Sequence, residues 1–184
     1  SFPVPSSMAV AVQIDTTRDG TKRILFANET QTDLANLGKL NSADPAVLYD
    51  FVSWGFRALP ARRFALIISS HGLGWRNPAE FRGVIYDESE KSTVNMVALK
   101  QALQMATTPA GTSPRKLDLL GFDACLMGLL EVAWQLKGVA RFLVFSQANE
   151  PAQGWPYHEI LAGLSQDLGG HTGETFGRAI CCLL

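Results

Sequence analysis

Two residues of this sequence could act together as a nucleophile and a base. Cys125 comes shortly after the apolar segment 117–122, and His71 comes shortly after the apolar segment 64–68. A thiolate is a strong nucleophile, and histidine is the side chain best suited to transfer protons near neutral pH. The pair therefore predicts covalent catalysis by Cys125 with His71 as the base. The alternative is a structural role for Cys125, because free cysteines are often buried in cores.

The residues after the histidine support the catalytic interpretation. The run is His71-Gly72-Leu73-Gly74-Trp75. Two glycines in three residues allow the backbone to approach a ligand closely and to turn its amides toward it. Other chemistries lack their motifs: there is no G-x-S-x-G elbow, and neither a third glycine nor a P-loop lysine follows Gly74. His158 and His171 have no comparable setting and are expected to be ordinary polar residues.

The elements that must position these residues alternate along the chain. Apolar segments predict strands at 8–14, 22–27, 64–68, 82–86, 117–122 and 141–146. Helical patterns are found at 45–59 (capped by Asp44), 94–106 (capped by Thr93), 126–137, 158–164 and 172–184. The first two strands are expected to pair antiparallel, 28–42 to form a loop, and 87–91 to be exposed and mobile. Because the core strands are apolar throughout, they predict an α/β fold with a mostly parallel sheet and helices on both faces.

In such a sheet, ligands bind at the carboxyl ends of the strands. The predicted strand ends deliver His71, Asp123 to Cys125, and Ser146 to Glu150 to the same edge. Cys125 also falls at the start of the predicted helix 126–137. The dipole and the free N–H groups of a helix N-terminus favour a thiolate.

Composition narrows the classes of function. The 184 residues carry 16 basic and 17 acidic side chains, a net charge of −1, with 47% hydrophobic and 18% charged residues. This is typical of one folded domain and argues against a basic nucleic-acid-binding or membrane-binding surface. No apolar run reaches the roughly 20 residues of a membrane span, and no signal peptide is evident. We expect a single domain, 1–184, that is a fragment of a longer chain.

The cysteines do not suggest a disulfide framework or a metal site. There are three, Cys125 and the adjacent pair Cys181 and Cys182, and no C-x-x-C pair. With only three histidines in the chain, a structural zinc site is not expected. Cys181 and Cys182 lie on an amphipathic helical segment and are interpreted as structural.

Three sequence blocks together resemble a known family. They are SSHGLGW (69–75), GFDACLMGLLEVAWQLK (121–137) and FSQANEPAQGWPY (145–157), in this order. The combination resembles the clostripain-like cysteine peptidases, which belong to the caspase-fold group, and the resemblance extends from about Met8 to the C-terminus. It implies a caspase-like three-layer α/β/α sandwich and a cysteine endopeptidase that cleaves after Arg or Lys. Its partner would be a peptide or protein with a basic residue before the scissile bond.

The resemblance also implies roles for individual residues. His71 matches the catalytic histidine and Cys125 the nucleophile, and the amides of Gly72 and Cys125 would form the oxyanion hole. Asp123 matches an acid that recognises the basic side chain of the substrate. The segment from Ser146 through Gln147 to Glu150 matches the wall of that specificity pocket.

Alternatives remain for the pocket residues. Asp123 could cap the predicted helix 126–137 instead, and Glu150 is the rival acid for the pocket unless it is a solvated loop residue. Trp155 and Tyr157 are expected to pack the loop that shapes the pocket, and Trp75 is either a pocket wall or a core residue. A different function is also open, either a non-catalytic caspase-fold interaction module or a cysteine hydrolase of other amides.

Family members often mature by cutting themselves after a basic residue between the His and Cys blocks. Lys91 is the first candidate for that cut, ahead of Arg82. No cofactor is expected to be required, but some members respond to calcium. Asp87, Glu88 and Glu90 could supply oxygen ligands for Ca²⁺ as a stabiliser or activator, although such acids are more often solvated. The resemblance favours a secreted or cell-surface location.

Overall fold

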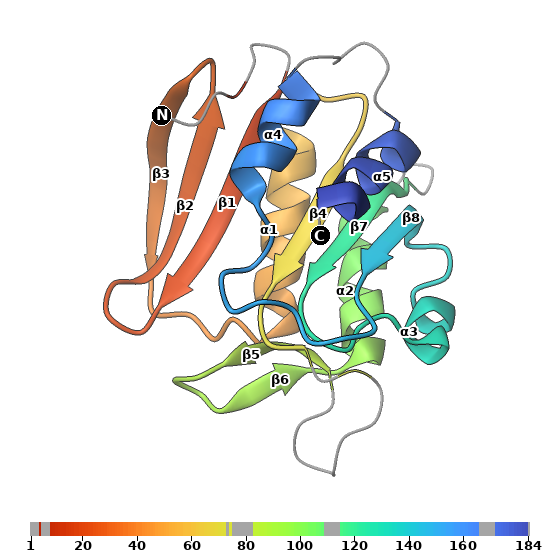
Figure 1. Cartoon of the computed structure of the whole chain (residues 1–184). Coiled ribbons are helices and arrows are strands. Elements are labelled where there is room, and N and C mark those ends of the chain that lie inside the picture. The colour runs from red at the N-terminus through yellow and green to blue at the C-terminus, as the bar shows by residue number, and fades with distance from the viewer. Residues whose placement is uncertain are drawn as a thin grey trace.

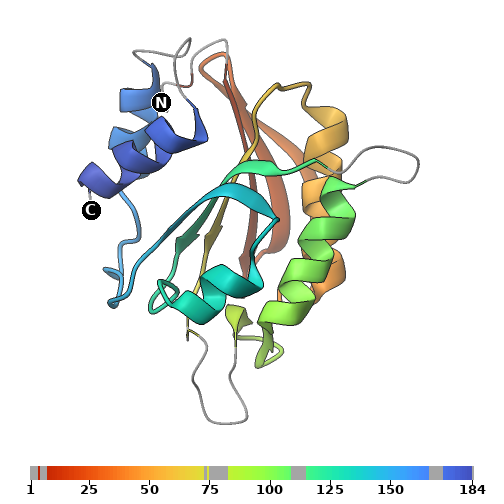
Figure 2. The ribbon, with the colours of Figure 1, turned by 90° about the vertical axis from the view of Figure 1, so that its right-hand side faces the viewer.

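The computed structural model describes residues 4, 8–72, 74, 83–108, 115–165 and 172–183. Three layers are visible (Figures 1 and 2). Helices α1 (Pro45–Ala58) and α2 (Met96–Thr107) cover one face of the strands, and α4 (Tyr157–Ser165) and α5 (Gly173–Leu183) cover the other. The predicted α/β/α sandwich is confirmed. The predictions for Trp75, Arg82 and His171 lie outside the described residues.

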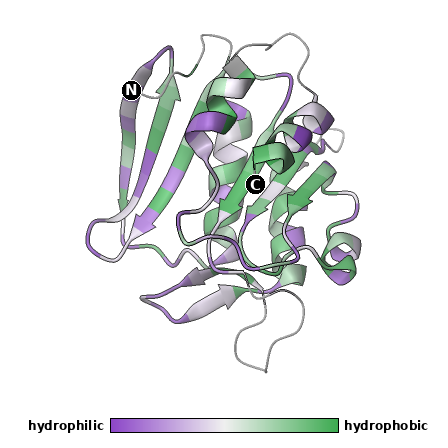
Figure 3. Cartoon of the chain, in the orientation of Figure 1, coloured by the Kyte–Doolittle hydropathy of each residue, from purple (hydrophilic) through white to green (hydrophobic). Residues whose placement is uncertain are grey.

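The central parallel sheet contains β4 (Ala65–Ser69), β7 (Leu117–Asp123) and β8 (Ala140–Phe145), in the order β4-β7-β8. Its strands are largely hydrophobic, as Figure 3 shows. Successive residues of β7 point into different cores. Leu120 packs on the side of α1 and α2, and Leu119 packs on the side of α4 and α5. Both are fully buried. A sheet covered on both faces needs apolar side chains at every position, which explains the pattern read from the sequence.

The N-terminal strands form an antiparallel sheet of β1 (Ala9–Thr16), β2 (Gly20–Ala27) and β3 (Thr30–Gly38). The antiparallel pairing of the first two strands is confirmed. The prediction of a loop at 28–42 was wrong, because β3 pairs with β2 along its length. Asn28 and Glu29 join them with φ of 51° and 60°, as a tight hairpin turn requires. β3 is a polar, mostly exposed edge strand and so carries no apolar signal.

Two helices begin at side-chain caps. Asp44 accepts a hydrogen bond from the Ala46 N–H and precedes Pro45 at the start of α1, as predicted. α2 is capped by Asn95 rather than by Thr93. Thr93 was the wrong cap because it belongs to β6 (Ser92–Val94), which pairs with β5 (Val84–Asp87) in a short hairpin.

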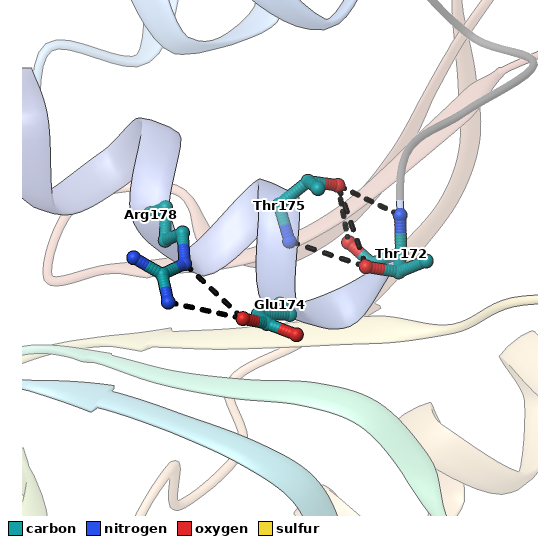
Figure 4. Close-up of polar contacts among 4 residues, drawn as sticks. All are labelled: Thr172, Glu174, Thr175 and Arg178. Carbon is teal, nitrogen blue, oxygen red and sulfur yellow. Dashed lines mark hydrogen bonds and ion pairs between the residues drawn. The ribbon is translucent and has the colours of Figure 1, made fainter.

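The start of α5 shows a reciprocal cap (Figure 4). The Thr175 N–H donates to Thr172 Oγ1, and the Thr172 N–H donates to Thr175 Oγ1. One turn later Arg178 donates to Glu174 from two nitrogens, Nε and Nη2. The threonine pair satisfies the N–H groups of Thr172 and Thr175 and fixes where the helix begins, and the Arg178–Glu174 contact adds a pair along the helix. Cys181 and Cys182 near its other end are exposed, so they are not core residues.

The predicted helix 126–137 was wrong over its first half. α3 covers only Leu130–Gln135, beside α2. Leu126 has a φ of +58°, a left-handed conformation that a helix cannot contain. The Leu126 and Gly128 N–H groups donate to Ala148 and Ser146 rather than to helical partners. Among the described residues, every helix is too short or too polar to cross a bilayer.

Candidate active site

The register of the parallel sheet brings His71 and Cys125 to one edge. Ser69 of β4 is paired with Asp123 of β7, and the Ser70 N–H donates to the Asp123 carbonyl at 3.2 Å. His71 and Cys125 each follow this pair by two residues. Both line a pocket of about 510 Å³, whose other walls are Gly72, Tyr86, Leu126, Asn149 and Glu150.

Gly72 is pressed against the backbone of Cys125. A Cβ atom at this position would lie 2.2 Å from the Cys125 carbonyl oxygen and 3.0 Å from its nitrogen. Gly74 has a φ of +60°, and a Cβ atom there would lie 2.7 Å from the Leu126 carbonyl oxygen. The backbone that these glycines approach is therefore the Cys125 loop itself. No residue with a side chain could occupy position 72 unless that loop moved.

Cys125 does not sit at a helix N-terminus, so the prediction that a helix dipole stabilises its thiolate was wrong. α3 begins five residues later. Instead, the Glu150 N–H donates to Cys125 Sγ at 3.3 Å. This N–H can stabilise negative charge on the sulfur at short range. It takes the place of the predicted helix N-terminus. Cys125 is partly buried and forms no disulfide.

His71 lines the same pocket. Its side chain is 72% exposed, and Nε2 lies 4.0 Å from Glu88 Oε1. The Tyr86 ring stands edge-on to the imidazole, with centroids 6.3 Å apart. Histidine and cysteine thus share one open cavity, an arrangement that suits proton transfer to and from a group bound between them.

Asp123 is buried behind the nucleophile, with 4% of its surface exposed. Its Oδ2 accepts hydrogen bonds from Ser69 Oγ at 3.2 Å, the Trp155 N–H at 3.2 Å and Tyr157 Oη at 2.7 Å. Burial, together with this carboxylate, raises the pKa of Tyr157 well above its usual range. Asp123 does not cap α3, whose N-cap is Leu129 and has no side-chain hydrogen bond. That alternative was wrong.

The loop after β8 shapes the site in two parts. Glu150 reaches the pocket together with Asn149. Ser146 and Gln147 are not among the residues that line it; the Ser146 hydroxyl accepts from the Ala148 N–H, and Gln147 is exposed. Farther along, Trp155 is buried in the core beneath α4, as predicted for a residue that packs this loop.

The prediction that 87–91 is exposed is confirmed for residues 88–91 and was wrong for Asp87. Asp87 is 3% exposed, and its two oxygens accept from the N–H groups of Ser42, Ser89 and Glu90. Burial alone would raise the pKa of Asp87, but these three donors outweigh it and lower that pKa. Lys91 is exposed, as expected, in a tight turn with a φ of +48°.

The prediction that acids of this turn bind calcium has no direct support in the geometry. Within the ranges that the structure describes, no group of three or more His, Cys, Asp or Glu side chains is placed to hold a metal ion. Both Asp87 oxygens are already committed to backbone donors. A role for calcium stays a prediction.

Two pocket residues were missed by the sequence analysis, Tyr86 and Leu126, whereas Asn149 was covered by it. Tyr86 had a usable signal, because it ends a predicted strand close after the histidine loop. Leu126 had none, since its position depends on a left-handed backbone that apolar residues rarely adopt. Asn149 lay inside a segment already expected to line the pocket.

Known proteins resemble this chain in sequence and in fold. The model of the clostripain family matches residues 7–181. Clostripain from Hathewaya histolytica is 34% identical over 128 residues, which are 65% of this chain and 22% of that protein. A secreted C11 cysteine protease from Bacteroides thetaiotaomicron, solved with an irreversible peptide inhibitor, aligns with a TM-score of 0.74 at 24% identity, over 94% of this chain and 47% of its own.

A second solved structure, an inactive zymogen of a C11 protease from Parabacteroides distasonis, aligns with a TM-score of 0.74 at 22% identity. The alignment covers 98% of this chain and 48% of the zymogen. At these identities the structural likeness establishes the fold. The chain spans about half the length of the solved relatives and about a fifth of clostripain.

Proposed function

Because this chain belongs to the clostripain family, we propose that it is the catalytic part of a cysteine endopeptidase that cleaves after basic residues. Cys125 is the nucleophile and His71 the proton-transfer residue. The observation that carries the proposal is the Ser69–Asp123 register, which places both side chains at one pocket. A role in one reaction explains why a buried sheet ends there in a thiol and an imidazole.

The reaction follows from the positions of these groups. Cys125 Sγ loses its proton to His71 and attacks the scissile carbonyl carbon, and the oxyanion forms next to the Gly72 and Cys125 backbones. Their amides are proposed as its donors, and the close approach of Gly72 to Cys125 supports this. His71 then protonates the leaving amine as the C–N bond breaks. Water, deprotonated by His71, hydrolyses the thioester and restores the thiol.

An acid beside the nucleophile supports a basic substrate side chain. Asp123 is buried, and none of the described residues forms an ion pair with it. Buried carboxylates without a cation are costly, so this one is suited to receive a guanidinium or ammonium group from the substrate. Glu150 is the alternative, because it lines the pocket directly. Access to Asp123 would require the segment 154–157 to shift.

The test uses the full-length protein that contains this chain and fluorogenic peptides ending in Arg, Lys, Leu or Asp. We expect cleavage after Arg or Lys, and a fall of at least about 10⁴-fold in kcat for Cys125→Ala and His71→Ala. Cys181→Ala is the matched control, because it removes an exposed thiol on α5. Cleavage that survives Cys125→Ala would overturn the mechanism. Complete inactivity of the full-length protein would favour a non-catalytic interaction module.

The variants Asp123→Asn and Glu150→Gln show which of the two acids binds the basic side chain of the substrate. We expect Asp123→Asn to reduce kcat/KM for Arg peptides about 100-fold while affecting Leu peptides little, because a charge-assisted contact is lost. Glu150→Gln should reduce it only a few-fold. The reverse order would assign the substrate's basic side chain to Glu150.

Self-cleavage after Lys91 remains part of the proposal. Exposure of Lys91 supports it. Proteases bind extended segments, so cleavage here requires the turn to open. N-terminal sequencing of the matured protein tests this, and full activity of an uncut chain would contradict it. One relative is described as secreted, and we propose a secreted or cell-surface location for this protein too.

A further inference from the structure

The hairpin formed by β5 and β6 lies against His71 and explains how that exposed side chain could be held. Among the described residues, two side chains of this hairpin contact the imidazole. Glu88 Oε1 is 4.0 Å from Nε2, and the Tyr86 ring meets the imidazole edge-on at an interplanar angle of 64°. With 72% of its surface exposed, His71 has little core packing to fix its rotamer.

Neighbouring side chains of the hairpin make different contacts. Tyr86 and Glu88 are two positions apart and both contact His71. Asp87, between them, is buried and accepts the Ser42 N–H at 2.8 Å. Asp87, the last residue of β5, therefore anchors the hairpin to the body of the domain, while Tyr86 of the strand and Glu88 of the following turn contact the imidazole.

The hairpin is also joined to the backbone on both sides of His71. The Tyr86 N–H donates to Ser70 Oγ at 3.0 Å, and Gly72 forms a β-bridge with Val84. The residues just before and just after the histidine are therefore tied to β5. A displacement of the hairpin would move the histidine loop with it.

Backbone strain is located at this junction. Ile85 has a φ of +64°, which is a genuine outlier for a β-branched residue. The β5–β6 register shifts at this residue, between Val84 and Tyr86. Such bulges redirect a side chain and are held in place only by surrounding contacts. Here the residue that follows the bulge is Tyr86, which lines the pocket.

We propose that Tyr86 and Glu88 are positioning residues for His71, an inference that rests on the proposed function. The Glu88 carboxylate, 4.0 Å from Nε2, favours a proton on that nitrogen, and the Tyr86 ring sets the plane of the imidazole. Nδ1 is then the basic nitrogen, which accepts the Cys125 thiol proton and later gives it to the leaving amine as the C–N bond breaks. A third group that fixes the tautomer of a catalytic histidine has this effect in other hydrolases.

The experiment compares four variants of the full-length protein: Glu88→Gln, Tyr86→Ala, Tyr86→Phe and Glu90→Gln. Glu90 is the matched control, an exposed acid of the same turn. We expect kcat to fall about three- to tenfold for Glu88→Gln, because an exposed pair contributes modestly, and more than about tenfold for Tyr86→Ala. KM should stay within about twofold. Tyr86→Phe, which keeps the ring, should restore most of the loss.

A second measurement does not depend on peptide cleavage. The rate of Cys125 alkylation by iodoacetamide is measured in the same variants and in His71→Ala, with thermal melts to verify folding. We expect His71→Ala to slow alkylation most, followed by Tyr86→Ala and then Glu88→Gln. Glu88 is 67% exposed, so its variant will fold even where Tyr86→Ala does not.

The outcomes are distinguishable. The positioning role is overturned if Glu88→Gln behaves like Glu90→Gln in both measurements, or if the variants change KM alone. If no peptide is cleaved but alkylation still depends on Glu88 and Tyr86, the proposed function fails while the positioning role stands. Alkylation that is indifferent to His71 would overturn both.

Discussion

The Cys125 side of the pocket is fixed by backbone contacts, whereas the His71 side is fixed by side chains of a short hairpin. Around Cys125, the Leu126 N–H donates to the Ala148 carbonyl and Gly72 leaves no room for a side chain. Around the imidazole of His71, the contacts within the described residues are a carboxylate oxygen 4.0 Å away and the edge of one ring. The nucleophile is held rigidly, and the base is held adjustably.

This difference suits the tasks of the two groups. A nucleophile must be aligned with a carbonyl carbon within a narrow range of distance, and rigid support provides this. A base that serves first the thiol, then the leaving amine and then water has to reach several atoms. The comparison also predicts where substitutions will have their largest effects, in the backbone-packed side of the site.

Gly72→Ala should give the largest effect of any substitution other than those of Cys125 and His71. Its Cβ would lie 2.2 Å from the Cys125 carbonyl oxygen, a backbone atom that cannot move alone. We expect a loss of at least about 3 kcal/mol in the free energy of unfolding and at least about 100-fold in kcat. Urea unfolding and steady-state kinetics measure both.

The matched control for this substitution is Gly163→Ala in α4. Nothing lies within 4 Å of a Cβ there, so alanine should stabilise the helix by about 0.5–1 kcal/mol. A tolerated Gly72→Ala, with kcat near that of the unmodified protein, would show that the Cys125 loop adapts as readily as the hairpin. The contrast between the two sides would then be lost.

Gly154→Ala should separate specificity from nucleophile placement. Gly154 has a φ of +69°, and its Cβ would lie 2.7 Å from Asp123 Oδ2. We expect kcat/KM for Arg peptides to fall about 10- to 100-fold because the carboxylate is displaced, with Cys125 alkylation almost unchanged. Gly38→Ala has the same φ of +69° but an open surrounding. If both variants behave alike, backbone strain rather than Asp123 explains the effect.

The parts that could be predicted from the sequence are those that local pattern determines. The apolar β4 and β7 and the Asp44-Pro45 start of α1 each carry their own signal, and the strand ends therefore located His71 and Cys125 correctly. Spacing alone could not give the register that aligns Ser69 with Asp123, but parallel neighbours made a common edge the expected result.

The parts that were missed depend on contacts between distant segments. Residues 126–129 have helical composition, but hydrogen bonds to Ser146 and Ala148 hold them in another conformation. The charged turn at 87–91 reads as solvated, yet Asp87 is buried because Ser42, from a remote part of the chain, supplies one of its donors. Side-chain type predicts exposure only when no such partner exists.

Asp87→Asn should loosen the hairpin side without touching the Cys125 side. Its two oxygens accept hydrogen bonds from three backbone N–H groups. In asparagine one of these oxygens becomes an NH₂ group, which cannot accept a hydrogen bond. We expect a loss of about 1–3 kcal/mol in the free energy of unfolding at neutral pH. Asp19→Asn, at an exposed acid paired with Lys22, is the control and should change it by less than about 0.5 kcal/mol.

The difference in unfolding free energy between the protein and Asp87→Asn should shrink at acidic pH. Because the folded protein lowers the pKa of Asp87 below its usual value of 3.8, the stabilisation is complete above that value and disappears as pH falls through the folded pKa. Urea unfolding of the protein and of Asp87→Asn should therefore converge at acidic pH. A difference that stays constant at every acidic pH at which the protein still folds would assign the effect to packing rather than to the charge.

Tyr157→Phe should give the smallest effect and sharpen the account of Asp123. The variant removes the 2.7 Å hydrogen bond to Oδ2 but leaves the donors from Ser69 and Trp155. We expect a loss of about 1–2 kcal/mol in the free energy of unfolding near pH 8.

The pKa of Tyr157 is raised above its usual 10.0 in the folded protein, so this stabilisation is complete below pH 10 and declines as pH rises beyond it. Unfolding measured between pH 8 and 11 should show the two proteins converging. A gap that stays constant would mean that the hydroxyl acts through packing alone and that Asp123 does not hold its proton.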